Sequence, residues 1–283
     1  MASLVYNLLV AMNEAEFIQT IWEYYRAHGR HDIAWRKPAH TRNPYRIHVS
    51  EVMLQQTQVS RVAEKYPLFI GQFPTFKALV DASNADVLRA WQGLGYNRRA
   101  LNLKRAAEAV MHQYGGKLPS DPALLYGLPG IGEATAGSIA AFAFNAPIPF
   151  IETNIRRVFI HFFFPRSRKV SDERIMKLVR ATLDKEHPRE WYYALMDYGA
   201  MLGTQQKENA NTRSTRYRAQ PAFKGSRRAL RGKILKLLLT EGPITEDALV
   251  ERTGESEYQI HEVIEHLADE KFIIMRGKRY EIA

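Results

Sequence analysis

Residues 121–157, DPALLYGLPGIGEATAGSIAAFAFNAPIPFIETNIRR, form the stretch that decides the fold. The segment LPGIG predicts a tight turn around Gly130 and Gly132, and the small residues after it predict a helix from about Glu133 to Phe144. Glycine lets backbone N–H groups approach a ligand closely, and the first turn of a helix attracts anions. The turn therefore predicts a phosphate-binding site, with the carboxylate of Glu152 following it in the chain.

The whole chain is basic and contains enough apolar residues for real cores. It has 283 residues, 46% of them hydrophobic, and a formal net charge of +10. This composition argues against disorder and indicates a polyanionic partner. The sequence contains no cysteine, which excludes disulfides, thiolate-ligated metal centres and cysteine nucleophiles. Its nine histidines show no pair at metal-ligand spacing, so we expect no metal cofactor, apart from a monovalent cation that the glycine turn could hold.

The beginning of the chain predicts no export signal. Residues 1–12 are mildly apolar, but they lack a basic leading region and a small-residue cleavage site. We interpret residues 1–13 as an N-terminal extension. No apolar run is long enough to span a bilayer, so we expect no membrane contact and a location in the cytoplasm or nucleoid.

Helical periodicity dominates the rest of the chain and predicts a mostly α fold. Apolar residues recur at helical spacing in 14–28, 44–58, 100–114, 173–185 and 191–202, with Asn13 and Ser171 as expected N-caps. The segment 191–202, WYYALMDYGAML, is apolar nearly all round and should be buried. Asp197 lies within it, and a buried acid needs a partner.

Glu51 lies among apolar residues of the predicted helix 44–58. Partial desolvation of its carboxyl would favour the neutral form, which suits a general acid; a solvent-facing glutamate is the plainer alternative. The amides and hydroxyl of Gln55, Gln56 and Thr57 suit nucleic-acid base edges, although an exposed helix end has the same composition. Upstream, Trp35 beside Arg36 fits either a site or a lid on the core.

The loop GLGYNRR, residues 93–99, predicts a wedge that could enter a base stack. Leu94 and Tyr96 could fill the gap left by an extruded base while Arg98 holds phosphate. A helix connection with a packed tyrosine is the alternative.

Composition changes near residue 203. From 209 to 236 there are nine Lys or Arg residues, among them Arg213 and Arg227, and no acid. We interpret 204–226 as a basic linker that phosphates could hold. Residues 227–283 predict three helices and a terminal hairpin, the pattern of a winged helix, which reads nucleic acid or binds protein.

Several ordered motifs resemble one family. SEVMLQQTQV, GLGYNRRALNL, LPGIGEATAGSIAAFAF, residues 151–158 and ALMDYGAML are similar to the helix-hairpin-helix DNA glycosylases, most closely the MutY-type adenine DNA glycosylases. The resemblance covers about residues 14–203 and implies a two-lobed helical fold. It also implies base-excision repair of double-stranded DNA by a protein that we expect to be a monomer.

The resemblance assigns roles to residues of this chain. Glu51 matches the glutamate that protonates the leaving base, Glu152 the acid near the sugar, and Asn154 the asparagine after it. The positions that match the pocket of the extruded base are Trp35, Arg36, Ala134 and Asp197, and those that match DNA contacts are Gln55, Gln56, Thr57, Leu94, Tyr96, Arg98, Gly130, Gly132 and Thr135, to which we add Arg213 and Arg227.

The chain also departs from the family pattern. The four cysteines of the usual iron–sulfur cluster are absent, with Gly203 where the first would stand, and Glu152 replaces an aspartate. The C-terminal unit looks like a winged helix and not the Nudix-like domain of MutY proteins. Ala134 stands where the related enzymes that also cut the backbone place a Schiff-base lysine, so we expect no efficient lyase activity.

The leading hypothesis is a monofunctional DNA glycosylase that removes adenine opposite 8-oxoguanine or guanine. Extrusion of the nucleotide would precede hydrolysis of its N-glycosidic bond, with Glu51 as acid and Glu152 as stabiliser or nucleophile. The alternatives are a glycosylase for another base, such as uracil or thymine in a mismatch, and a non-catalytic protein that binds damaged DNA.

Overall fold

A computed structural model describes residues 12–206, 208–219, 223 and 225–283. The predicted N-terminal extension lies almost wholly outside these residues. Helices make up nearly all of the regular structure, and the described residues form a single two-stranded sheet, which confirms the mostly α fold. None of the described helices combines the length and the apolar character needed to cross a membrane.

The chain divides into two compact units. The first contains Met1–Glu51, Pro119–Gly127 and Ile131–Ala219. Its helices are α1 (Glu14–His28), η2 (Ala34–Arg36), α2 (Pro38–Thr41), α8 (Pro122–Tyr126), α9 (Glu133–Phe144), α10 (Thr153–Phe163), α11 (Asp172–Thr182), α12 (Pro188–Gln205) and η3 (Ala210–Arg213). Helix α3 (Pro44–Leu54) begins in this unit and ends in the other.

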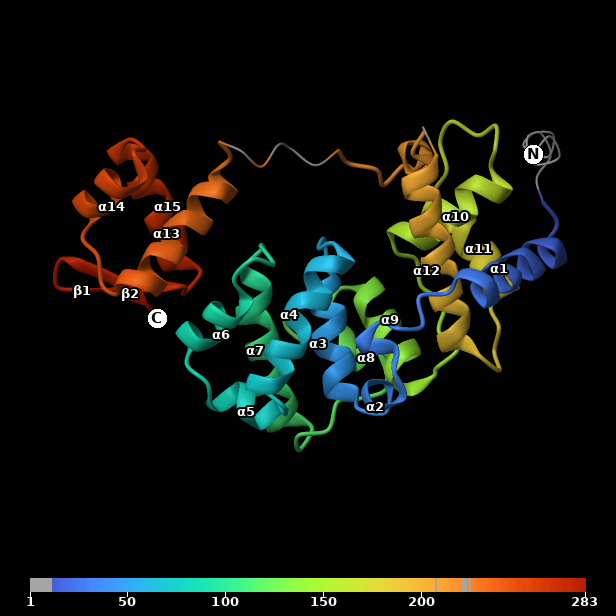
Figure 1. The fold of residues 1–283 in the computed structure, drawn as a ribbon, viewed down its shortest axis with the longest axis horizontal. Helices are drawn as coiled ribbons and strands as arrows, with labels where there is room; N and C mark the ends of the chain where they lie inside the picture. Colours follow the sequence, from blue (N-terminus) through green and yellow to red (C-terminus); the bar gives the residue numbers. More distant parts are fainter. Residues whose placement is uncertain (1–11, 207, 220–222, 224) are drawn as a thin grey trace. The chain divides into compact units, whose positions relative to one another are not determined.

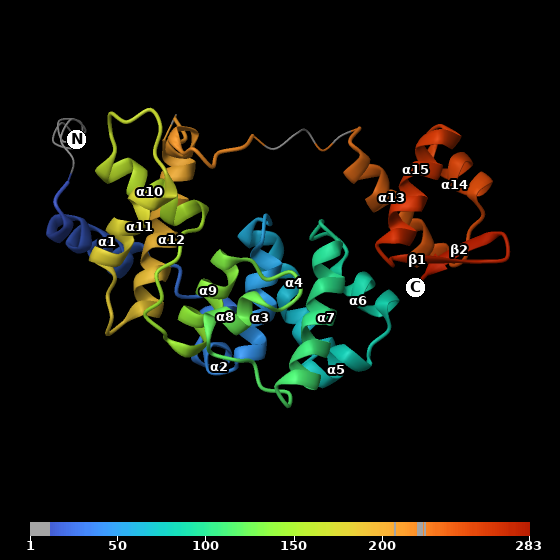
Figure 2. The ribbon, with the colours of Figure 1, turned by 180° about the vertical axis from the view of Figure 1, so that it is seen from behind.

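An aromatic cluster forms much of the core of the first unit. The ring of Phe17 on α1 lies 5.0 Å from that of Phe159 and 4.9 Å from that of Phe163, both on α10, and 6.1 Å from that of Trp191 on α12. Figures 1 and 2 show these three helices beside one another, together with α11. Burial of large aromatic surfaces supplies most of the stabilisation at such a junction.

Small residues let two helices of this unit approach their neighbours closely. A Cβ atom at Gly137 of α9 would lie 2.5 Å from the Cβ atom of Phe150. At Gly199 of α12 it would lie 2.6 Å from the backbone oxygen of Asn154, which belongs to α10. The backbones of α10 and α12 therefore meet without an intervening side chain, at the turn that carries Glu152 and Asn154.

The second unit contains Val52–Leu118, Leu128–Gly130 and Gln220–Ala283. Its elements are α4 (Val59–Gln72), α5 (Phe76–Asp81), α6 (Asn84–Trp91), α7 (Arg98–Gln113), α13 (Arg227–Glu241), α14 (Glu246–Thr253), α15 (Glu257–Asp269), β1 (Ile273–Arg276) and β2 (Arg279–Ile282). The strands pair antiparallel around Gly277, with Ile273 opposite Ile282. Three helices and a hairpin thus follow in the predicted order, and their assignment as a winged helix stays a prediction.

Helix α3 and the predicted linker 204–226 differ from what the sequence predicts. Helix α3 ends at Leu54 and not at residue 58, because Gln56 adopts a left-handed backbone (φ 53°) that an α-helix cannot contain. Part of the predicted linker 204–226 is folded: Ala210, Asn211 and Ser214 are buried, and Ser214 forms an isolated bridge with Val170. Residues 207, 220–222 and 224 of that linker lie outside the described residues.

The close approach at Gly199 gives a stability prediction. Gly199→Ala should lower the free energy of unfolding by about 1–3 kcal/mol, because the new methyl group forces α12 away from Asn154. Chemical denaturation measures this change. Gly71→Ala is the matched control: a Cβ atom added to this helical glycine would have no other atom within 4 Å, so alanine should raise the same free energy by about 0.5–1 kcal/mol. Equal effects of the two substitutions would contradict the packing argument.

Candidate active site

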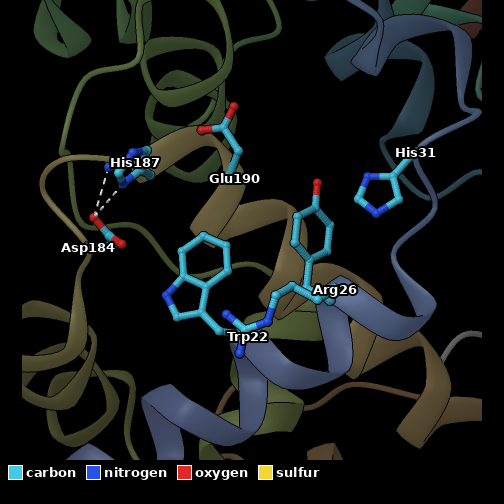
Figure 3. A pocket seen from close by; sticks show the side chains of 7 residues that line it. Trp22, Arg26, His31, Asp184, His187 and Glu190 are labelled. Atoms are coloured by element: carbon cyan, nitrogen blue, oxygen red, sulfur yellow. Dashed lines mark hydrogen bonds and ion pairs between the residues drawn. The ribbon is translucent and has the colours of Figure 1, made fainter.

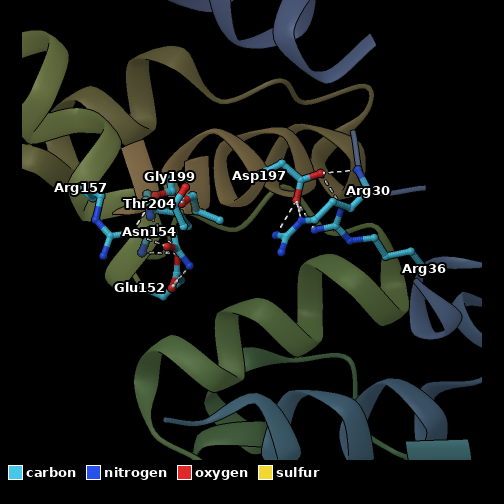
Figure 4. A network of polar contacts seen from close by, with 10 residues as sticks. Arg30, Arg36, Glu152, Asn154, Arg157, Asp197, Gly199 and Thr204 are labelled. Atoms are coloured by element: carbon cyan, nitrogen blue, oxygen red, sulfur yellow. Dashed lines mark hydrogen bonds and ion pairs between the residues drawn. The ribbon is translucent and has the colours of Figure 1, made fainter. Parts of the chain in front are cut away.

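A buried carboxylate held by two arginines forms one side of the site. Asp197 on α12 is 3% exposed and accepts hydrogen bonds from the Arg30 backbone N–H and Nε, at 2.8 and 2.7 Å. The two Nη atoms of Arg36 bind its two oxygens at 2.8 Å each (Figure 4). Burial acts to raise the pKa of Asp197, but Arg36 and Arg30 outweigh it and hold that pKa below its ordinary value. Arg36 and Arg30 are therefore the partners that this buried acid was expected to need. The sequence did not single out Arg30.

Glu51, near the end of α3, has a pKa close to neutral pH. Burial of the carboxyl raises the pKa of Glu51 to about 7; the charge of Glu152 acts in the same direction. A side-chain hydrogen bond with Ser138 of α9 and the charge of Arg36 act against this rise. Ser138 is buried, and its hydroxyl also lies 3.0 Å from the backbone oxygen of Thr135. Nothing in the sequence pattern pointed to Ser138.

Glu152 caps the N-terminus of α10. Its Oε1 atom accepts hydrogen bonds from the backbone N–H groups of Asn154, at 2.7 Å, and Ile155, at 2.8 Å. Burial raises the pKa of Glu152, while the two amides and the charges of Arg156 and Arg157 act against that rise. A carboxylate at this position also interacts favourably with the helix dipole. Glu152 thus has two backbone N–H groups and two nearby arginine charges that stabilise its charged form against burial.

Arg157 fixes the turn that carries Glu152 and Asn154. One of its Nη atoms donates to Asn154 Oδ1 at 2.8 Å and to the backbone oxygen of Gly199 at 2.7 Å (Figure 4). From the folded part of the linker, Asn211 Nδ2 donates to the backbone oxygen of Thr153 at 3.0 Å. The first turn of α10 is therefore tied both to α12 and to η3.

The same region offers no ligands for the cluster that the family resemblance implies. Iron–sulfur clusters require cysteine thiolates, and the chain has none. At Gly203, the position expected for the first cysteine, a Cβ atom would lie 2.7 Å from the Arg157 guanidinium. The residues present therefore do not fit a cluster, and polar contacts of Arg157 and Asn211 occupy this region.

The glycine turn needs glycine at one of its two positions. Gly130 has φ +78°, and a Cβ atom there would lie 2.7 Å from that of Asn102. Gly132 caps α9 with an extended backbone and has open space around it. The backbone conformation therefore requires glycine at Gly130 and not at Gly132, and the approach of a phosphate to this turn stays a prediction. Ala134 and Thr135 follow in the first turn of α9, where they are half-buried.

The predicted wedge residues, Leu94 and Tyr96, belong to the second unit, and so does Gln56. Gln56 and Tyr96 both have left-handed backbones, with φ 53° and 48°. Such conformations are uncommon outside glycine and concentrate at functional sites. Arg99 supports both loops, because it donates to Thr57 Oγ1 and to the backbone oxygen of Leu94. Leu94 itself is 3% exposed, so its entry into DNA would require a rearrangement and stays a prediction.

Three arginines predicted to bind DNA have protein partners in this structure. Arg98 pairs with Glu270, and Arg227 pairs with Glu262. Arg213 donates to the backbone oxygens of Phe164 and Pro165, at 2.6 and 2.8 Å. Gln55 Nε2 similarly lies 3.3 Å from the backbone oxygen of Gly130. Contacts of these residues with DNA stay predictions.

Trp35 is 4% exposed, which agrees with its packing in the core and leaves a direct role open. A separate surface pocket lies on the first unit, lined by Trp22, Arg26, His187 and Glu190 among others (Figure 3). None of the predicted site residues lines this pocket, and the carboxyl pair does not belong to it. No group of three or more potential metal ligands occurs among the described residues.

The structure thus places two carboxyl groups with different hydrogen-bond partners near each other, with Arg36 close enough for its charge to act on Glu51. Glu51 can give a proton to a leaving group, and Glu152 can stabilise positive charge. Most glycoside hydrolases cleave a glycosidic bond with a pair of carboxyl groups in these two roles.

Comparisons with known proteins identify the family of the chain. Residues 49–184 match the family described as HhH-GPD superfamily base excision DNA repair protein. The adenine DNA glycosylase of Mycolicibacterium smegmatis is 35% identical over 226 residues, which cover 75% of this chain and 76% of that protein. That of Mycobacterium tuberculosis H37Rv is 35% identical over 241 residues, covering 78% of each. The chain spans about half of a Buchnera aphidicola adenine DNA glycosylase, with 36% identity over 195 residues and 54% of that protein covered.

Solved structures share the fold. A thermostable thymine-DNA glycosylase has a TM-score of 0.60 and 24% identity, covering 69% of this chain and 90% of its own. A non-covalent endonuclease III–DNA complex has a TM-score of 0.58 and 18% identity, with the same coverage. The chain matches the family model, shares the fold of these glycosylases and covers more than three quarters of the length of the two mycobacterial relatives. It therefore belongs to the HhH-GPD superfamily of base excision DNA repair proteins.

Proposed function

We propose that this protein is a DNA glycosylase that hydrolyses the N-glycosidic bond of an extruded adenine, opposite 8-oxoguanine or guanine, in double-stranded DNA. The observation that carries the proposal is the carboxyl pair: Glu51 has a pKa near 7, and Glu152 lies close enough for its charge to raise that pKa. The names of the two mycobacterial relatives, both adenine DNA glycosylases, supply the base. The protein would act as a monomer in the cytoplasm or nucleoid.

The proposed reaction uses the two carboxyl groups in sequence. Extrusion of the nucleotide costs roughly a few kcal/mol in lost stacking and pairing, which contacts of Leu94 and Tyr96 with the opened duplex would offset. Glu51 then donates its proton to a ring nitrogen of the base, which makes the base a neutral leaving group. The carboxylate of Glu152 stabilises the positive charge that develops on the sugar, and water completes the hydrolysis. Asn154 keeps Glu152 in place through its backbone N–H.

DNA would be held at several points outside the carboxyl pair. The backbone of the Gly130–Gly132 turn and the first turn of α9, with Thr135, suit a phosphate group, and a monovalent cation could share that site. Gln55, Gln56 and Thr57 would contact the base opposite the lesion. The basic linker 204–226 and the C-terminal unit 227–283, which we interpret as a winged helix, would extend the interface.

One observation favours a second candidate, a non-catalytic protein that binds damaged DNA. Glu152 Oε1 is engaged by two amides of its own helix, and the side chain is one methylene longer than the aspartate of the family pattern. A glycosylase for uracil or thymine mismatches is a further alternative within the enzyme class. Activity on defined duplexes separates these functions.

The test of the function is excision from duplexes carrying A:8-oxoguanine, A:guanine, U:guanine, T:guanine or hypoxanthine, with alkali to reveal abasic sites. We expect excision of adenine first. Glu51→Gln should reduce the single-turnover rate by at least about 10²-fold, since general acid catalysis contributes that much, and should leave duplex affinity nearly unchanged. Tight binding without cleavage of any duplex would support the binding protein and refute the enzyme.

The pH dependence of excision should report the proton on Glu51. The acid form acts, and it is present below the pKa of about 7. The single-turnover rate constant at saturating enzyme should therefore fall about tenfold per unit well above pH 7, and it should also fall at low pH, where Glu152 takes up a proton and loses the charge that the reaction needs. In Ser138→Ala the midpoint should move to higher pH, because the lost hydrogen bond had stabilised the charged form. A rate that keeps rising through pH 7 and above would show that Glu51 is not the acid.

We also propose that the enzyme is monofunctional. Ala134 offers no amine at the position where a Schiff-base lysine would stand, so no covalent imine with the opened sugar should form there. Incubation with a cleavable duplex and borohydride measures this directly. Accumulation of a trapped protein–DNA adduct at a rate comparable to base excision would refute the monofunctional assignment.

A further inference from the structure

Tyr193 on α12 carries a buried hydroxyl group that makes no hydrogen bond with any of the described residues. The side chain is 5% exposed. Its ring is stacked on Phe142, with centroids 4.6 Å apart and an interplanar angle of 14°, and the Arg36 guanidinium carbon lies 4.3 Å from its centroid. The ring is therefore fixed from two sides while its polar atom stays unpaired, which is unfavourable in the free protein.

The preceding tyrosine shows what a structural hydroxyl looks like in the same helix. Tyr192 donates its O–H to the backbone oxygen of Ile148 at 2.8 Å and accepts from the Phe150 N–H at 3.4 Å. Buried tyrosine hydroxyls generally find such partners. Tyr193 differs from Tyr192 in this respect, although both rings are buried.

The charged groups around Tyr193 place its hydroxyl at the candidate active site. Burial raises the pKa of Tyr193; Arg36 lowers it and Glu51 raises it, so both residues are near enough to act on the phenol. The hydroxyl thus stays protonated and can donate one hydrogen bond and accept others. Arg36 Nε is also buried without a partner among the described residues. Two unpaired polar groups therefore lie beside the proton donor.

The other polar side chains named in this region are not free to accept a hydrogen bond from the amino group of a base. Arg30 and Arg36 can only donate hydrogen bonds, and the oxygens of Asp197 are already engaged by both arginines. Glu51 is committed to a ring nitrogen of the base. An exocyclic amino group needs an acceptor, and the Tyr193 hydroxyl is an uncommitted group that can accept.

We propose that Tyr193 is a specificity-determining residue whose hydroxyl hydrogen-bonds the exocyclic amino group of an extruded aminopurine. The inference rests on the proposed glycosylase function and adds the group that reads the base. A site built to pair a polar group of its substrate rejects analogues that lack that group, because its own buried hydroxyl then stays unpaired.

The experiment compares Tyr193→Phe with Tyr192→Phe in the full chain. Each variant is measured by single-turnover excision of adenine and of purine lacking the 6-amino group, both opposite 8-oxoguanine, and by thermal unfolding. Tyr193→Phe should slow adenine excision about tenfold and purine excision less than about threefold, since only adenine loses a hydrogen bond. It should also raise the melting temperature by about 2–4 °C, because an unpaired buried hydroxyl is removed.

Tyr192→Phe should behave in the opposite way, with a lower melting temperature and unchanged selectivity between the two bases. Equal slowing of both substrates by Tyr193→Phe, or a rate equal to that of the unmodified protein, would overturn the inference alone. A shift in the pH midpoint of excision would overturn it too, since Tyr193 would then act through Glu51. Absence of excision by the unmodified protein on every duplex would refute the proposed function, and the inference with it.

Discussion

The buried ion pair of Asp197 with Arg36 and Arg30 is the interaction on which the rest of the site depends. Removal of a carboxylate and a guanidinium from water costs several kcal/mol per ion, and only close pairing with further hydrogen bonds offsets that cost. Asp197 meets this condition through two bonds from each arginine. Loss of one partner would leave a buried charge without compensation. Arg36 is consequently held in one position, and that position places its guanidinium over the ring of Tyr193.

Arg36 also acts on one of the two carboxyl groups, because its positive charge opposes the rise in the pKa of Glu51. Glu51 and Glu152 are both buried, yet their hydrogen-bond partners differ. Glu152 receives two backbone N–H groups at a helix N-terminus, which stabilise its charged form. Glu51 has a serine hydroxyl and the charge of Arg36, which desolvation and the charge of Glu152 outweigh, so its pKa rises to about 7. In the proposed reaction Glu51 donates the proton, and the N–H groups that Glu152 accepts from support its role as the negative charge.

Much of this arrangement could be predicted from local sequence signals. Caps at Asn13 and Ser171 set the start of α1 and α11, and the all-round apolar character of residues 191–202 indicated a buried helix in which Asp197 needed a partner. The contributions of Ser138, Tyr193 and Arg30 could not be predicted, because each arises from contacts between segments far apart in the chain. The early end of α3 was missed for a similar reason: the left-handed backbone of Gln56 sits where Arg99 binds the loop, through Thr57 and the end of α3.

The helix-capping hydrogen bonds of Glu152 have a physical consequence for the proposed reaction. Its Oε1 atom accepts from two backbone amides at the start of its own helix. Covalent attack on the sugar by that oxygen would require both hydrogen bonds to break, at a cost of roughly 1 kcal/mol or more each in a buried site. Electrostatic stabilisation requires no such movement, because the charge is already fixed in place, and preorganised charge is the larger contribution in many enzymes. The capped geometry therefore favours Glu152 as a stationary counter-charge over Glu152 as a nucleophile.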